Sequence, residues 1–234
     1  MMISPESYYE MNLKGKNAKQ IMSAIRGLKN EIGHLKNVME HPEYGSGMLI
    51  EPSESTRLWC MRLYLERAKQ ALADEGVVYK PSQAELKAQE FENNIPFISK
   101  IAFEIGGYFG GYTTRIISFD GEELLVRLHH TLCPDPEIPQ AELILPMDKD
   151  EFLDELSDLH IGEWRRSYRP ERFGYSYCDG TQWGLEIQFS NGAKPFKSYG
   201  DNSYPYNFNK FQELLGIDVS EEDYEEEDDE SVTI

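Results

Sequence analysis

Apolar residues recur at helical spacing along the first third of the chain. The positions of a first stripe alternate in steps of four and three residues: Ile21, Ile25, Leu28, Ile32, Leu35 and Met39. A second stripe follows the same rhythm: Leu58, Met61, Leu65, Ala68 and Leu72. Because residues 41–47 between the stripes are rich in helix breakers, the pattern predicts an antiparallel helical hairpin over about residues 17–75. Its two apolar seams could pack on each other, on the rest of the chain or on a partner.

A third, shorter helix is expected after the hairpin. Ser82 and Glu85 stand at the spacing of a capping box, in which each side chain satisfies a free backbone amide at the start of a helix. The pattern therefore predicts a helix over about residues 82–93. Pro96 bars its continuation, because proline lacks the amide that the helix needs.

From residue 97 the chain changes to short β-prone runs separated by turn residues. These runs cover residues 97–105, 112–119, 123–130 and 142–145. Asp120-Gly121 between two of them is a strong hairpin signal, since both turn residues need a positive φ. A helix capped by Asp148 is expected over about residues 149–159, with Phe152, Leu156 and Leu159 on its inner face.

The last third uses the same turn chemistry. Asp179-Gly180 and Asn191-Gly192 flank a cleanly alternating run, which predicts a three-stranded meander over about residues 173–200. A closing helix is expected over about 207–215, ending at Gly216. The predicted fold class is α+β, in which a helical region at 1–96 precedes a mainly antiparallel sheet with two or three packed helices at 97–217. A disordered acidic tail at 218–234 completes the prediction.

Charge divides the molecule unevenly. The formal net charge is −19, of which residues 218–234 carry −10, residues 1–80 carry +1 and residues 81–217 carry −10. This excess argues against nucleic-acid binding through a general basic surface, because phosphate contacts need clustered lysine and arginine. The first helix of the hairpin is locally basic, either as a solvated face or as a surface that docks on the acidic remainder.

The expected cellular location and the expected lack of cofactors rest on signals that the sequence does not contain. The first ten residues have no apolar run of the kind that a secretory signal needs, and no stretch approaches the length of a membrane-spanning helix. Cys60, Cys133 and Cys178 are too scattered for a disulfide framework or a zinc site. His129 and His130 are adjacent on a predicted strand and should point to opposite faces. We therefore expect a cytoplasmic protein with no membrane association, no metal and no cofactor.

Part of the C-terminal third resembles a family of uncharacterised bacterial proteins. The resemblance covers about a quarter of the chain and follows a pattern of Trp, Asp-Gly-x-x-Trp and Gly-x-Asn-x-Tyr-Pro-x-Asn-Phe. In this sequence the pattern is formed by Trp164, Asp179, Gly180, Trp183, Gly200, Asn202, Tyr204, Pro205, Asn207 and Phe208. The resemblance implies a discrete C-terminal module and no particular reaction.

Two groups of residues in this module are candidates for binding. Four arginines fall within eight residues beside two aromatic rings: Trp164, Arg165, Arg166, Tyr168, Arg169 and Arg172. Guanidinium groups suit a carboxylate or phosphate ligand, but the arginines could equally pair with acids of this chain, such as those at 150–155. Asn202, Tyr204 and Tyr206 form the second group, suited to recognition or to covering the edge of the core.

The chain has none of the usual catalytic signatures, including a phosphate loop, a nucleophile elbow or a metalloprotease motif. The sequence therefore favours a non-enzymatic binding or regulatory protein that acts through protein–protein contacts, with a homodimer through the N-terminal helices as one option. A second hypothesis is an acidic mimic of nucleic acid that inhibits a nucleic-acid-binding protein, as anti-restriction and anti-CRISPR inhibitors do. A third is an enzyme whose site the sequence does not reveal.

Overall fold

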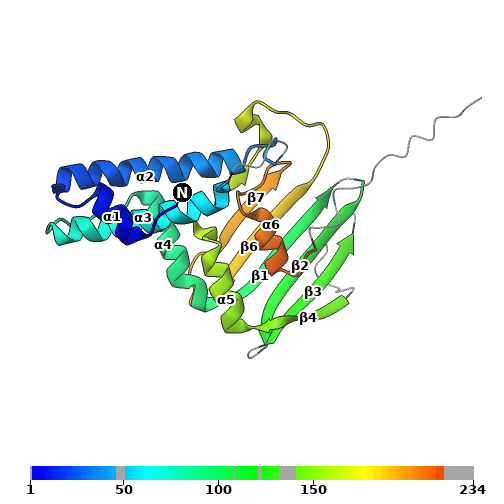
Figure 1. Ribbon diagram of the computed structural model, residues 1–234. Coiled ribbons are helices and arrows are strands. Elements are labelled where there is room, and N and C mark those ends of the chain that lie inside the picture. Colours follow the sequence, from blue (N-terminus) through cyan, green and yellow to red (C-terminus); the bar gives the residue numbers. More distant parts are fainter. Residues whose placement is uncertain (1, 46–50, 108, 121–122, 132–140, 219–234) are drawn as a thin grey trace, which may run out of the picture.

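A helical layer stands beside a seven-stranded sheet in this protein (Figure 1). The computed structural model describes residues 2–45, 51–107, 109–120, 123–131 and 141–218. The predicted α+β class is confirmed. The acidic residues predicted to form a disordered tail, apart from Asp218, lie outside the described residues.

The helical layer consists of α1 (Pro5–Asn12), α2 (Ala18–Met39) and α3 (Glu54–Asp74). The predicted hairpin is confirmed, because α2 and α3 pack against each other along both apolar stripes. A capping box between Asn17 and Gln20 begins α2, and the Ser53 hydroxyl caps α3. The short helix α1 was not predicted, since its hydrophobic and polar residues follow no clear stripe.

Both seams of the hairpin are used inside the molecule. The residues buried between α2 and α3 form one core cluster, joined by α1 and by Tyr206 from the far end of the chain. The two seams therefore pack on each other, which is the first of the three options that the sequence left open. Homodimerisation through these helices would have to use their outer faces, and it stays a prediction.

The sheet has the order β4-β3-β2-β1-β6-β7-β5. Its strands are β1 (Ile98–Gly107), β2 (Gly111–Asp120), β3 (Glu123–Thr131), β4 (Ala141–Asp148), β5 (Ser167–Tyr168), β6 (Gln182–Phe189) and β7 (Phe196–Asp201). All neighbours are antiparallel except the short β5, which runs parallel to β7. The first four predicted strands are confirmed, with β4 extending past the predicted end.

Three helices cover one face of the sheet: α4 (Gln83–Asn94), α5 (Lys149–Asp158) and α6 (Phe208–Leu214). The predicted caps of α4 and α5 are in place at Ser82 and Asp148, and α6 lies within the predicted range of the closing helix. The second core cluster lies between these helices and the inward residues of the strands. α4 contributes Phe91 to this cluster, as does Ile95 directly after it, so the apolar side of α4 packs with the sheet.

The predicted three-stranded meander is wrong. Only β6 and β7 form a hairpin there, through the predicted Asn191-Gly192 turn. Residues 174–181 form no strand and leave the sheet, because the rings of Phe173 and Tyr175 pack edge-on against His41 at the end of α2. Asp179-Gly180 therefore precedes β6 as part of a long connection and joins no two adjacent strands.

Within the described residues, no helix is both long and apolar enough to cross a membrane.

Candidate functional site

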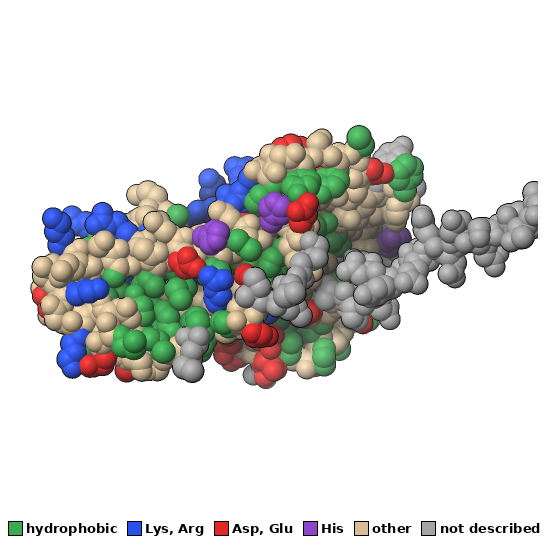
Figure 2. Space-filling view, turned by 45° about the horizontal axis from the view of Figure 1, so that its top comes forward, with side chains coloured by type: hydrophobic (Ala, Val, Ile, Leu, Met, Phe, Trp, Pro, Cys, Tyr) green, Lys and Arg blue, Asp and Glu red, His purple; other side chains and the backbone are tan. Residues whose placement is uncertain are grey.

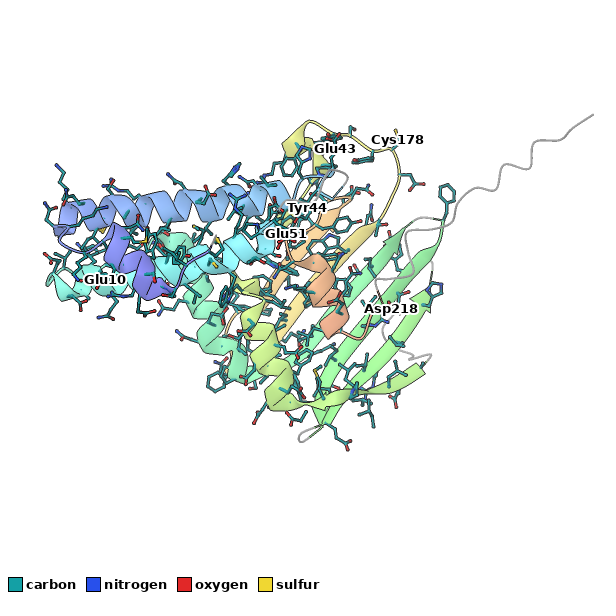
Figure 3. All side chains as sticks on the ribbon, viewed as in Figure 1. Glu10, Glu43, Tyr44, Glu51, Cys178 and Asp218 are labelled. Carbon is teal, nitrogen blue, oxygen red and sulfur yellow. The ribbon has the colours of Figure 1, made fainter. Side chains whose placement is uncertain are left out.

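An open groove of about 1030 Å³ runs between the helical layer and the sheet domain. One wall is the end of α2 and the start of α3, where Tyr44 and Trp59 stand. The other wall is the end of α5 together with residues 202–210. Tyr44 lies at the end of the helical layer nearest the sheet, whereas Glu10 lies at the opposite end (Figure 3). A volume of this size is at the upper end of the range for ligand sites in proteins.

A network of charged groups joins the two walls of the groove, and its members Arg62 and Tyr206 line the groove itself. Glu163 follows α5 and accepts two hydrogen bonds from Arg62 of α3, at 2.9 and 2.6 Å, as well as one from Lys36 of α2. Arg62 also donates to the Tyr206 hydroxyl at 3.0 Å, which in turn donates to the Leu159 carbonyl. These bonds tie three helices and the C-terminal module together.

Burial and charge shift the pKa values of these groups in opposite directions. Burial alone would raise the pKa of Glu163, but the bonds from Arg62 and the charge of Lys36 outweigh it and lower that pKa to about 2. Burial lowers the pKa of Lys36 in spite of the nearby Glu163. The outcomes differ because Glu163 has two cationic partners, whereas Lys36 is attracted by Glu163 and repelled by Arg62.

Two residues of the groove have an unusual backbone conformation. His160 and Asn202 are the two described residues other than glycine with a positive φ, at 52° and 46°. Both line the groove. The Asn202 side chain explains its own position, because its amide oxygen accepts from Thr181 N at 2.9 Å and its amide nitrogen donates to the Asp179 carbonyl. Strained residues of this kind gather at functional sites more often than elsewhere.

Two of the four arginines in the predicted cluster pair with one buried carboxylate. Glu40, whose side chain is only 4% exposed, pairs with Arg172 at 2.6 Å and with Arg165 at 3.5 Å. The pairing with acids of the same chain is therefore confirmed, but the acid is the residue directly after α2. The acids at 150–155 that the sequence suggested make no ion pair with the arginines. Arg166 and Arg169 are exposed and have no ion-pair partner among the described residues.

The structure places the two predicted aromatic residues of this cluster in the core. Trp164 and Tyr168 are 2% and 3% exposed. The Trp164 indole donates to the Asn207 side chain, and the Tyr168 hydroxyl accepts from the backbone of Arg165. Neither ring is available to stack on a ligand, because both already pack against Trp183. Their expected role in binding is therefore corrected to a role in folding.

Only one of the two groups of predicted binding residues lies in the groove. Asn202, Tyr204 and Tyr206 line it, whereas the arginine group at 164–172 lies outside it. Sequence reasoning missed the residues that line the rest, above all Trp59, Arg62, His160 and the acids at the ends of α5 and α6. Trp59 did carry a signal, because it is a large aromatic residue placed off the apolar stripe of its helix.

The two adjacent histidines lie on opposite faces of β3, as predicted. His129 is buried opposite Thr114, and His130 bonds to the Thr113 hydroxyl on the other face at 3.1 Å. Across the part of the chain that the structure describes, no three or more His, Cys, Asp or Glu side chains converge as metal ligands.

No family model, curated protein or solved structure matches this chain. The bacterial family whose pattern the C-terminal module resembles therefore stays a prediction.

Proposed function

We propose that this protein is a non-enzymatic binding protein that takes up a segment of a partner protein in the groove between its helical layer and its sheet domain. The observation that carries the proposal is the exposure of Trp59. This side chain is 62% exposed although it lines a groove whose opposite wall offers Tyr204 and Tyr206. Tryptophan and tyrosine are the residues that most often dominate the binding energy of protein interfaces.

The charged groups of the groove also favour binding over catalysis. A catalytic acid or base must be able to exchange a proton near the working pH. Glu163 has a pKa of about 2 and is occupied by Arg62 and Lys36, so it stays ionised and holds the two walls together. Burial raises the pKa of Tyr206 further above its usual value, which keeps its hydroxyl protonated. These groups fix the shape of the groove.

Site-specific crosslinking tests the proposal. A photoreactive phenylalanine analogue placed at Trp59 in the full chain should crosslink a defined partner in lysate of the host. The same analogue at Phe97, which is 45% exposed and lies outside the groove, is the matched control and should not. Trp59→Ala should reduce recovery of that partner by about tenfold or more, and Phe97→Ala should leave it unchanged. Equal crosslinking from both positions would refute the proposal.

The other two hypotheses from the sequence stay predictions. Mimicry of nucleic acid depends mainly on residues 218–234, of which only Asp218 is described. An enzyme would need a group in the groove that is free to transfer protons or to attack a substrate, and the strongly shifted groups there are engaged in structural bonds.

A further inference from the structure

Three acidic side chains line the groove without a counter-ion. Glu155 and Asp158 stand in the last turn of α5, and Glu213 stands near the end of α6. All three are exposed. Among the described residues none of them forms an ion pair. On the face shown in Figure 2, acidic side chains gather below the centre, whereas basic ones follow the upper edge of the helices.

The two carboxylates of α5 stand where the helix itself is negative. The last carbonyl groups of a helix have no partner within it, so its C-terminal end attracts cations and repels acids. α5 nevertheless has Glu155 and Asp158 in its last turn and no basic residue there. Their position is unfavourable for folding, and a cation brought by a ligand would remove that penalty. Such a local conflict is typical of a functional surface.

The basic groups of the groove do not neutralise these acids. Arg62 is engaged by Glu163 and Tyr206. Burial and the neighbouring Arg62 lower the pKa of His160, so its ring is neutral at pH 7. Among the lysine and arginine residues described in the lining of the groove, this leaves Lys210 without an ion pair. The unpaired carboxylates therefore exceed the unpaired cations.

Exposed aromatic rings share the groove with the acids. Trp59, Tyr44 and Tyr177 are 62%, 44% and 48% exposed, and all three line it. The face of an aromatic ring attracts a cation, most strongly in the case of tryptophan. Tyr206 already receives Lys36 in this way, with the ammonium group 5.2 Å from the ring centre. Carboxylates and aromatic faces together match the ammonium or guanidinium group of a long side chain.

We propose that the groove recognises a basic segment of a partner protein, with a lysine or arginine side chain held by Glu155, Asp158 and Glu213 and stacked on Trp59. This proposal rests on the proposed function and adds the class of partner. The formal net charge of −19 would speed the encounter with such a partner. Phosphate groups and acidic peptides are excluded from this surface by the same carboxylates, because like charges repel.

Two synthetic peptides test the proposal on the full chain. One alternates arginine with leucine and alanine, and the other has glutamine at every arginine position. Fluorescence anisotropy should show that the arginine peptide binds about tenfold or more tightly than the glutamine peptide. Three variants are compared with the wild type. The groove variant combines Glu155→Gln, Asp158→Asn and Glu213→Gln, and Trp59→Ala is the second.

The third variant is a control for net charge. It combines Glu75→Gln, Glu90→Gln and Glu123→Gln, which remove the same charge from exposed positions outside the groove. The groove variant should lose about tenfold in affinity for the arginine peptide, and the control should stay within about twofold of the wild type. The groove variant should also unfold at a higher temperature than the wild type, because it removes acids from the end of α5. That shift confirms that the loss of binding is not a loss of folding.

The outcomes separate this proposal from the proposed function. Equal losses in the two triple variants, or equal binding of both peptides, would overturn recognition of a basic segment. If Trp59→Ala alone weakens binding, the groove is a binding site of another specificity, so the proposed function stands and this inference fails. If sedimentation velocity shows a dimer that the groove variant abolishes, the occupant is a second copy of this chain and a separate basic partner is refuted.

Discussion

Single residues fit closely together around Trp183. Its indole donates to the Ser203 carbonyl at 3.0 Å inside the core. Gly200 lies directly beneath this bond, and a methyl group there would overlap both the indole nitrogen and the Ser203 carbonyl. Glycine at this position is thus needed for close approach and not for an unusual φ. This gives a physical reason for the tryptophan and glycine of the C-terminal pattern.

Gly200→Ala should therefore destabilise the protein. We expect the free energy of unfolding to fall by about 1–3 kcal/mol, because the buried indole and the turn after β7 must both move. Urea denaturation followed by tryptophan fluorescence measures this change. Gly27→Ala is the matched control. Gly27 is exposed on α2 with open space around it, so this change should stabilise the protein by up to about 1 kcal/mol. A neutral Gly200→Ala would refute the packing argument.

Sequence reasoning also has its limits at the scale of the residue. Judged by side-chain chemistry alone, the rings of Trp164 and Tyr168 and the four guanidinium groups suit ligand binding. Whether a ring faces solvent or the core depends on which elements pack over it, and that information lies far away in the sequence. Glu40 is the example, since 125 residues separate it from Arg165. Because such partners lie far apart in the sequence, the sequence suggested a ligand site at the arginines. The structure instead shows a contact between the arginines and Glu40 of the same chain.

At the scale of elements, the segment that contains β5 is fastened to the end of α2. Arg172 bonds to Glu40 and to the side chain of Asn37, and His41 lies between the rings of Phe173 and Tyr175. A carboxylate that is almost fully buried is costly unless its partners stay in place. The contact therefore depends on Glu40 more than on any exposed arginine.

Glu40→Gln should loosen this segment. The arginines would lose a charged acceptor, and we expect the free energy of unfolding to fall by about 1–3 kcal/mol. Hydrogen exchange of the amides in residues 165–175 should accelerate by a larger factor than exchange in β1. Arg166→Gln serves as the comparison, since Arg166 is exposed and forms no ion pair with any described residue, and its effect should stay within about 0.5 kcal/mol. Unchanged exchange in Glu40→Gln would contradict this account.

Most elements could be predicted from local pattern, whereas their arrangement could not. Caps, apolar stripes and turn dipeptides are local signals, and they located α2, α3, α4, α5 and the strands up to β4. The pairing of β1 with β6 joins segments that are distant in sequence, as in the contact between Ile101 and Ile187, which are 86 positions apart. The meander failed for a related reason, because Tyr175 packs against His41 beyond the end of α2, and Asp179 and Thr181 bond to the Asn202 side chain without forming a strand.

At the scale of the whole molecule, two core clusters are joined by the network around Glu163. This carboxylate follows α5 and is bonded by Lys36 and Arg62, which belong to the other cluster's helices. Tyr206 completes the joint by packing against the helical core. The shape of the groove, and with it any binding in the groove, depends on this joint remaining charged and closed.

The joint should make stability depend on acidic pH. In an unfolded chain the Glu163 carboxyl takes up its proton with a pKa near 4.5, whereas in the folded protein that pKa is about 2. The unfolded form therefore binds the proton first as pH falls, so the stabilisation is complete above about pH 4.5 and is lost as the pH approaches 2. Glu85, which pairs with Lys29, has a pKa lowered to about 2 as well and acts in the same window.

Glu163→Gln should remove its share of this dependence. At pH 7 we expect the free energy of unfolding to fall by about 2 kcal/mol. This is less than the pKa of Glu163 alone implies, because the burial of the charged Lys36 opposes folding. The difference from the wild type should shrink as pH falls from about 4.5 toward 2, and the slope that remains should come from other carboxyls with a lowered pKa, among them Glu85 and Glu186. Urea midpoints measured across this range test both statements. Glu66→Gln, at a carboxylate that is 69% exposed, should leave the profile unchanged. A constant difference between wild type and Glu163→Gln down to pH 2 would show that Glu163 joins the two clusters by packing rather than by its charge.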